Sequence, residues 1–159
     1  MNRSSENSAG KLVRVAVNIA EPWAYADGLC LDGMEVRAMR GYSRWCGREL
    51  YWFHIDEPDL PEALAQGRID VAIGGLCALP DLARCARLVR FGRHPLAHGV
   101  SGHALARPHV WAVRRSALSV WAGVSVYLKL RERAEFFSSR RAGGTRPAFD
   151  RTGLPENGP

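Results

Sequence analysis

The side chains best able to do chemistry in this sequence are its cysteines and histidines. Four cysteines are separated by 16, 31 and 8 residues, so none forms a CxxC pair: Cys30, Cys46, Cys77 and Cys85. Structural zinc sites normally draw their ligands from such close pairs. We therefore expect no zinc site, while disulfide bonds in an oxidising compartment stay open as an alternative.

A looser cluster combines Cys77 and Cys85 with four downstream histidines, His94, His98, His103 and His109. Neutral imidazole is a common metal ligand, and a thiol beside an imidazole can act as a nucleophile. Pro95 and Gly99 disfavour the helix that would present His94 and His98 together. We predict loop histidines and buried thiols here, with no metal, no cofactor and no catalytic residue, and hence a protein that is not an enzyme.

Arginines recur every three residues at Arg84, Arg87, Arg90 and Arg93, and on a helix they would form one basic stripe. The charge is uneven as well, because residues 1–75 carry 8 basic and 11 acidic side chains whereas residues 76–159 carry 14 and 5. A basic stripe can bind phosphates, but a solvated helix face has the same composition. We favour the solvated face and keep nucleic-acid or anionic-surface binding as the alternative. Neither GxGxxG nor GxxxxGK[ST], the glycine-rich phosphate loops, is present.

The elements that could position a site are clearest between Leu60 and Gly75. Apolar residues at helical spacing predict a short helix from Leu60, and Gly67 suits its left-handed end. The β-branched run from Ile69 to Ile73 then predicts a buried strand, which ends in Gly74-Gly75. Ligands of open parallel sheets bind beyond the carboxyl ends of the strands, so this diglycine loop is our first candidate site.

Two more units precede that stretch. Alternating apolar residues predict a strand over Leu12–Ile19, which Glu21-Pro22-Trp23 interrupts. A helix is predicted over Met34–Cys46, ended by Gly47, and an aromatic-rich strand follows over Leu50–Ile55. The apolar face of that helix would consist of Ala38, Met39, Tyr42, Trp45 and Cys46. The order β-α-β-α-β predicts an α/β fold, a small parallel sheet with helices on both faces.

The second half of the chain is less regular. Apolar residues alternate strictly from Leu118 to Leu130, which favours a strand, although a helical seam through Leu118, Trp121, Ser125 and Leu128 also fits. Such a strand could extend the sheet. We expect a disordered lead over residues 1–10, a lobe over 11–100, an extension over 101–137 and a disordered tail over 138–159.

Length and hydropathy set the outer limits. A chain of 159 residues, 47% hydrophobic and 24% charged, suffices for one domain with a real core. No run reaches the roughly 18–20 apolar residues of a membrane span. The start, MNRSSENSAG, lacks the apolar centre of a signal peptide, so the sequence as it stands predicts a cytoplasmic protein.

Several of these pieces together resemble the first lobe of bacterial extracellular solute-binding proteins, family 3, of the type II periplasmic binding-protein fold. The resemblance covers about residues 11–100 and rests on five pieces in the family's order: LVRVAVN, Pro22-Trp23, Leu31 to Val36, Ala63 to Ala72, and Phe91 to Pro95 followed by Gly99. It implies a periplasmic location. It also implies capture of a small solute, of the amino-acid or organic-acid class, for an ABC-type uptake system and its permease, or for a sensor.

The resemblance also implies ligand-binding residues. Trp23 stands where the family places an aromatic ring that stacks on the ligand, and Gly75 opens a loop that resembles Gly-x-Ser-x-Thr-x-x-Arg, which holds a carboxylate. Here Cys77 replaces the serine, Leu79 the threonine and Leu82 the arginine, and Arg84 could substitute two residues later. These departures put an α-amino-acid ligand in doubt. For Asp70 we expect a structural role.

The resemblance also implies a second lobe and a segment that returns to complete the first, and residues 101–159 resemble neither. We therefore expect a truncated or degenerate member of the family. The alternatives to solute binding are the basic-surface binder described above and an enzyme of the same fold, such as a dehydratase. The only acid beside Trp23 in the sequence is Glu21.

Overall fold

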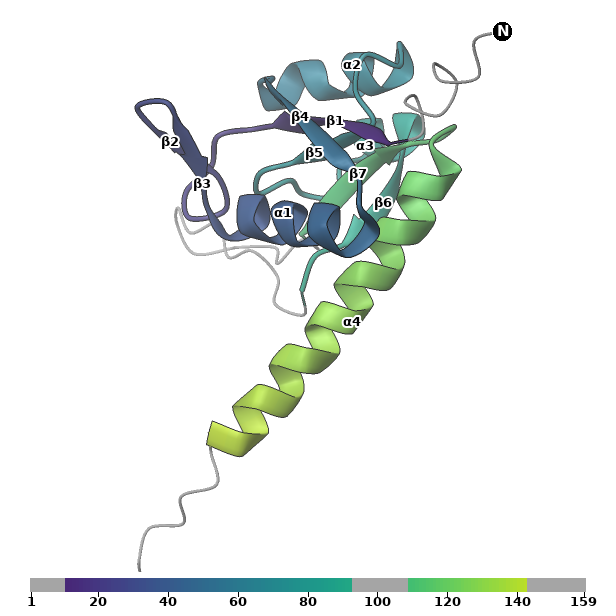
Figure 1. Cartoon of the computed structure of the whole chain (residues 1–159). Helices are drawn as coiled ribbons and strands as arrows, with labels where there is room; N and C mark the ends of the chain where they lie inside the picture. The colour runs from purple at the N-terminus through teal and green to yellow at the C-terminus, as the bar shows by residue number, and fades with distance from the viewer. Residues whose placement is uncertain (1–10, 93–108, 143–159) are drawn as a thin grey trace, which may run out of the picture.

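The computed structural model describes residues 11–92 and 109–142, and a five-stranded sheet forms its centre (Figure 1). The spatial order of the strands is β4 (Glu49–His54), β1 (Leu12–Val17), β5 (Val71–Ile73), β7 (Val110–Arg114) and β6 (Ala86–Arg90). β1 pairs in parallel with both β4 and β5, whereas β7 runs antiparallel to β5 and to β6. The predicted α/β fold with a parallel β-α-β-α-β unit is therefore confirmed, and two later strands widen the sheet.

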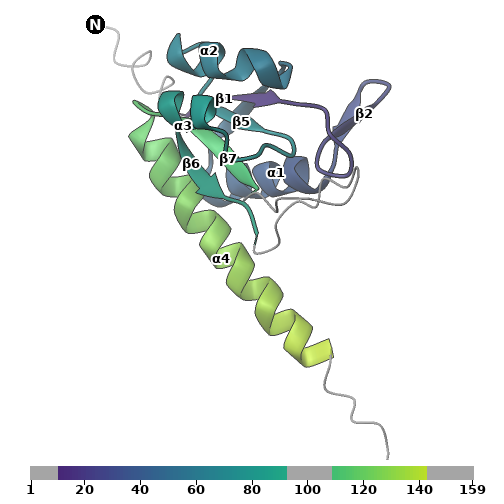
Figure 2. The ribbon, with the colours of Figure 1, turned by 180° about the vertical axis from the view of Figure 1, so that it is seen from behind.

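Helices cover both faces of this sheet (Figures 1 and 2). On one face α1 (Met34–Cys46) and α4 (Leu118–Ala142) enclose a core with the side chains of Val13, Val15 and Trp111. On the other face α2 (Leu60–Ala65) and α3 (Pro80–Cys85) enclose a second core with Ala16 and Ala72. Successive residues of a strand point to opposite faces, so each central strand contributes to both cores.

The helix α1 has the predicted bounds, and Gly47 ends it in the left-handed conformation with φ of 68°. Its buried face differs from the prediction at the carboxyl end. Ala38, Met39 and Tyr42 are buried, but Trp45 is 49% exposed and Cys46 only half-buried. Trp45 instead packs its ring against a tyrosine of α4, Tyr127, with the ring centroids 5.9 Å apart.

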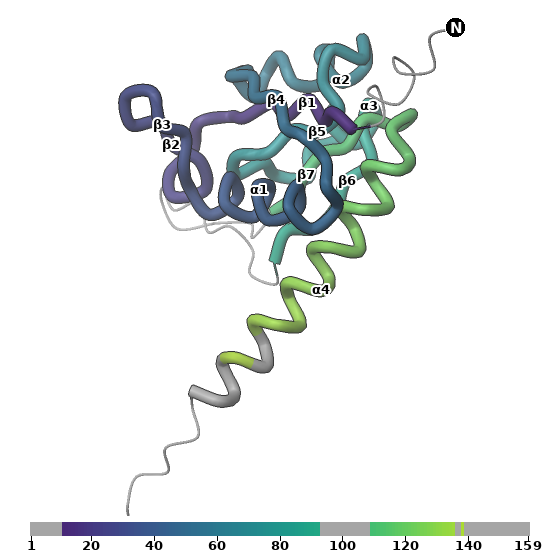
Figure 3. Tube along the Cα trace, in the orientation of Figure 1, coloured from purple at the N-terminus to yellow at the C-terminus, as the bar shows by residue number. Residues whose placement is uncertain are grey.

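The strand prediction for Leu118–Leu130 is wrong, because this stretch begins the 25-residue helix α4. Among the α4 residues whose side chains the structure describes, the buried ones are Val120, Val124 and Leu128, one on each successive turn. The extra strand is β7, which lies just before this helix. Figure 3 shows α4 crossing beside the sheet and extending past it, and the helix runs beyond Ser138 to Ala142.

Neither α3 nor β6 was predicted, and two further local features were missed as well. β2 (Tyr25–Asp27) and β3 (Cys30–Asp32) form an antiparallel hairpin, and η1 (Glu57–Asp59) is a 3-10 turn before α2. The arginines spaced by three do not share a helix, because Arg84 lies in the last turn of α3 whereas Arg87 and Arg90 lie on β6. Arg93 lies outside the described residues.

Candidate functional site

Three chain segments meet at one edge of the sheet, where β1 and β5 end and β7 begins. Because β1 and β5 are parallel and β7 is antiparallel to β5, their adjoining ends lie together. Trp23 follows β1, Gly74 and Gly75 follow β5, and His109 precedes β7. This is the edge at which open α/β sheets bind ligands.

Trp23 is held by the first turn of α1. The backbone N–H of Glu35 donates to the Trp23 carbonyl at 3.0 Å, and the N–H of Met34 donates to the Pro22 carbonyl at 3.2 Å. Gly33, with φ of 129°, lets the helix begin this close, because a Cβ there would overlap the Trp23 carbonyl. The loop that carries the indole is therefore fixed to α1.

The Trp23 ring lies directly over the diglycine loop. Gly75 has φ of 69°, and a Cβ on it would come within 2.8 Å of the indole. The indole also contacts His109, whose ring meets it edge to face with the ring centroids 4.4 Å apart. Trp23 is half-buried, so the core does not enclose it completely.

Glu35 supplies the polar centre of the site, below Trp23. Its carboxylate accepts hydrogen bonds from the backbone N–H groups of Gly74 at 2.8 Å and Gly75 at 2.9 Å. The Nε2 atom of His109 contacts the same carboxylate, and both side chains are almost wholly shielded from solvent, at 0% and 1% exposed. A buried carboxylate requires such donors to offset the loss of water.

The sequence did not lead us to place Glu35 or His109 in this site. His109 was considered only within the loose cysteine–histidine cluster, and Glu21, the only acid noted beside Trp23 in the sequence, is exposed. A signal for Glu35 was present in the sequence. It is a charged residue in the first turn of α1, directly before the apolar Val36. His109 directly precedes β7, a strand that was not predicted. Without that strand nothing in the sequence brings residue 109 near residue 35.

The other predicted site residues lie farther along the loop. Cys77 is buried, and its backbone forms a bridge with that of His109. Arg84 lies at the exposed end of α3, where Nη1 is 3.2 Å from a carboxylate oxygen of Asp81 and the side chain is 77% exposed. The structure therefore brings Trp23 and Gly75 into contact and places Cys77 in the same loop, whereas Arg84 pairs with a neighbour on its own helix.

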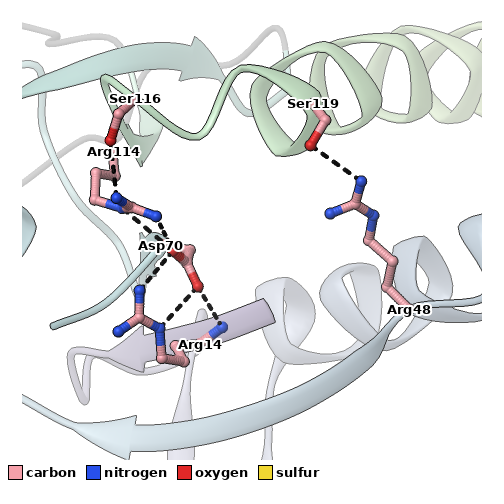
Figure 4. A network of polar contacts seen from close by, with 6 residues as sticks. All are labelled: Arg14, Arg48, Asp70, Arg114, Ser116 and Ser119. Atoms are coloured by element: carbon pink, nitrogen blue, oxygen red, sulfur yellow. Dashed lines mark hydrogen bonds and ion pairs between the residues drawn. The ribbon is translucent and has the colours of Figure 1, made fainter. Parts of the chain in front are cut away.

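Asp70 lies at the opposite edge of the sheet, where it joins β1, β5 and β7 (Figure 4). Its carboxylate accepts bonds from the backbone and guanidinium of Arg14 at 2.9–3.0 Å and from Arg114 at 2.7 and 3.2 Å. Burial works to raise the pKa of Asp70, but the hydrogen bonds from Arg14 and Arg114 outweigh it and hold that pKa below its ordinary value. Asp70 therefore connects neighbouring strands, which is the structural role that we expected for it.

Within residues 11–92 and 109–142, no three His, Cys, Asp or Glu side chains are grouped so as to hold a metal ion. Three of the histidines considered as ligands, His94, His98 and His103, lie outside those ranges. No helix in the part of the chain that the structure describes is long and apolar enough to cross a membrane.

No family model matches the sequence, and no curated protein matches it. Solved structures do resemble the fold. The arginine-bound domain 1 of TmArgBP superposes with a TM-score of 0.62 at 18% identity, covering 78% of this chain and 96% of that one. Holo ArgBP from T. maritima gives 0.68 at 10% identity, covering 87% and 99%.

A periplasmic binding protein of Salmonella typhimurium with high arginine specificity gives a TM-score of 0.64 at 7% identity, covering 83% of this chain and 98% of that one. At such identities the likeness establishes the fold alone. The chain has the fold of one lobe of a periplasmic binding protein. β7 and α4 belong to that lobe, although residues 101–159 do not resemble the family's returning segment in sequence.

Proposed function

We propose that this chain is a small-solute-binding module that captures a ligand of the amino-acid class where Trp23 covers Gly75. The observation that carries the proposal is the convergence of Trp23, the diglycine loop and His109 at the carboxyl edge of the parallel strands. The similar domain 1 of TmArgBP is described as arginine-bound, so one lobe of this fold suffices for a ligand in that protein.

The wider role belongs to the same proposal. We place the chain with the extracellular solute-binding proteins of family 3, acting in the periplasm and delivering its solute to an ABC-type permease or to a sensor. We propose capture without catalysis, because the acid and the histidine nearest Trp23 are buried and engaged with each other and with the loop.

The basic-surface alternative loses its main support. It required one helical stripe, but Arg84 pairs with Asp81 and the Arg87 guanidinium lies 5.0 Å from the centre of the Trp121 ring. A ring contact of this kind engages one face of the guanidinium. A salt-dependent DNA shift assay would be expected to show no specific complex.

Arginine is the first solute to test, by titration calorimetry and by tryptophan fluorescence. We expect the fluorescence to respond to arginine and the Trp23→Ala substitution to remove the response. Loss of a ring–cation contact should weaken binding roughly 3- to 30-fold.

The matched control is Trp45→Ala, because Trp45 is exposed on α1 and packs against Tyr127. This variant should keep both the affinity and the response. A response that survives Trp23→Ala but disappears in Trp45→Ala would place the solute elsewhere.

A further inference from the structure

We infer, building on the proposed solute-binding role, that this lobe recognises a cationic amine or guanidinium solute and does not grip a carboxylate. The reason is that an internal carboxylate, Glu35, already occupies the donors of the diglycine loop. The resemblance to amino-acid-binding proteins would imply the opposite, a loop open to the carboxylate of the ligand.

The diglycine loop is an anion-binding arrangement that is already filled. Successive backbone N–H groups that point the same way form a concave site for anions, and Gly74 and Gly75 direct theirs to the two oxygens of Glu35. Each N–H carries one hydrogen, and His109 adds a third contact to the same carboxylate. A solute carboxylate could use these donors only by displacing a fully buried side chain.

The side chains at the positions that the resemblance assigns to a carboxylate do not replace them. Leu82, at the position that the resemblance assigns to a carboxylate-binding arginine, is buried in the core beneath α2 and α3. Leu79 and Cys77 stand where hydroxyl groups would be needed, and both lack one. Arg84 is paired with Asp81 on the exposed side of α3.

What remains for a solute is the indole of Trp23, a residue that is only half-buried, and the acid two positions before it in the chain. The face of an indole attracts cations. The charged residue nearest to Trp23 in the chain is an acid, Glu21, whose side chain is exposed. Both features favour a positive group on the solute.

The test compares arginine with agmatine, which is arginine without its carboxylate, on the wild-type chain by titration calorimetry. We expect the two dissociation constants to agree within about threefold, because a carboxylate held by charged hydrogen bonds would make agmatine roughly tenfold weaker or more. Glutamate should not bind.

A tenfold preference for arginine over agmatine, or binding of glutamate as tight as that of arginine, would overturn the inference and leave solute binding standing. Absence of binding by all three would overturn the proposed function itself, and the inference with it. The two failures are therefore distinguishable.

A second measurement addresses the filled loop without any solute. Glu35→Ala leaves the N–H groups of Gly74 and Gly75 beside a cavity that formate or acetate could enter. We expect formate or acetate to raise the Tm of this variant relative to chloride at equal ionic strength, and to leave wild type and the exposed-acid control Glu62→Ala unchanged. An equal response in all three proteins would contradict Glu35 as the group that fills the loop; if Glu35→Ala does not fold, the agmatine comparison decides.

Discussion

Asp70 shows how one carboxylate can connect strands that are distant in sequence. Two guanidinium groups, from Arg14 and Arg114, donate to it, while its own backbone N–H donates to the Arg14 carbonyl and its carbonyl accepts from the Arg114 N–H. The side chain of Asp70 is 9% exposed, and those of the two arginines are about one-third exposed. Removing a largely buried acceptor would leave two cations without their partner.

We therefore expect Asp70→Asn to lower the free energy of unfolding by roughly 2–4 kcal/mol at pH 7. The pKa of Asp70 is lower in the folded state, so its contribution is complete above the unfolded pKa near 4 and is lost as pH falls through the folded pKa. Urea unfolding from pH 7 to pH 3 should show the two proteins converging at the acid end. Asp81→Asn, which removes an exposed acid paired with Arg84, is the control; a loss as large as that of Asp70→Asn would contradict the argument.

Single residues also show what sequence reasoning can reach. Trp23 and Gly75 were predicted to share one edge because each follows a predicted parallel strand, and the structure places the indole on the glycine. Glu35 and His109 were missed because their contact links a helix to a strand 74 positions away. A local pattern carries no information on such a contact until the strand order is known.

Among the elements, α4 shows how the spacing of apolar residues can predict the wrong type of secondary structure. Leu118 to Leu130 alternate in a way that fits a strand, and the same residues fit a helix with Val120, Val124 and Leu128 on one face. Short apolar runs are ambiguous between the two periods. The length of the uninterrupted stretch, 25 residues without an internal proline, favoured the helix, because strands are usually much shorter.

The contact between α1 and α4 depends on a glycine. A Cβ at Gly41 would overlap the hydroxyl of Tyr127. We expect Gly41→Ala to destabilise the wild type even though alanine is the better helix former by about 1 kcal/mol. In a Tyr127→Phe background the overlapping oxygen is absent and the nearest ring carbon, Cζ, lies 3.2 Å from that Cβ, so the same substitution should cost less stability than in the wild type.

Chemical denaturation of the four proteins in this cycle measures the coupling between the two sites directly. If Gly41→Ala changes stability equally with and without the Tyr127 hydroxyl, the helices do not meet at this glycine. The cycle thus tests the packing of α4 on α1 independently of any solute.

For the molecule as a whole, the first half of the fold was predictable and the second half was not. The three parallel strands and the two α-helices between Leu12 and Ile73 each carry a local signal, so their order β-α-β-α-β predicted the parallel sheet, although the hairpin of β2 and β3 was missed. β6 and β7 pair across residues 93–108, and β7 inserts between β5 and β6. Such an insertion depends on pairing between strands that are distant in the sequence. The alternation of apolar residues within one segment cannot specify that pairing.

Because β7 contributes side chains to both faces, the sheet is shared by two hydrophobic cores. Trp111 and Val113 of β7 face the core of α1 and α4, whereas Val110 and Ala112 join the core of α2 and α3. Neither core can lose its strands without exposing the other. We therefore expect one cooperative unfolding transition, with far-UV circular dichroism and tryptophan fluorescence giving coincident midpoints.

The same argument predicts the effect of truncating one buried leucine in each core. Leu64→Ala in α2 and Leu128→Ala in α4 should each lower the stability by roughly 2–4 kcal/mol and should move the whole transition for both probes. Leu130→Ala, at a position 47% exposed on α4, should leave it nearly unchanged. Two separate transitions in either buried variant would mean that the cores unfold independently. The shared sheet would then not couple them.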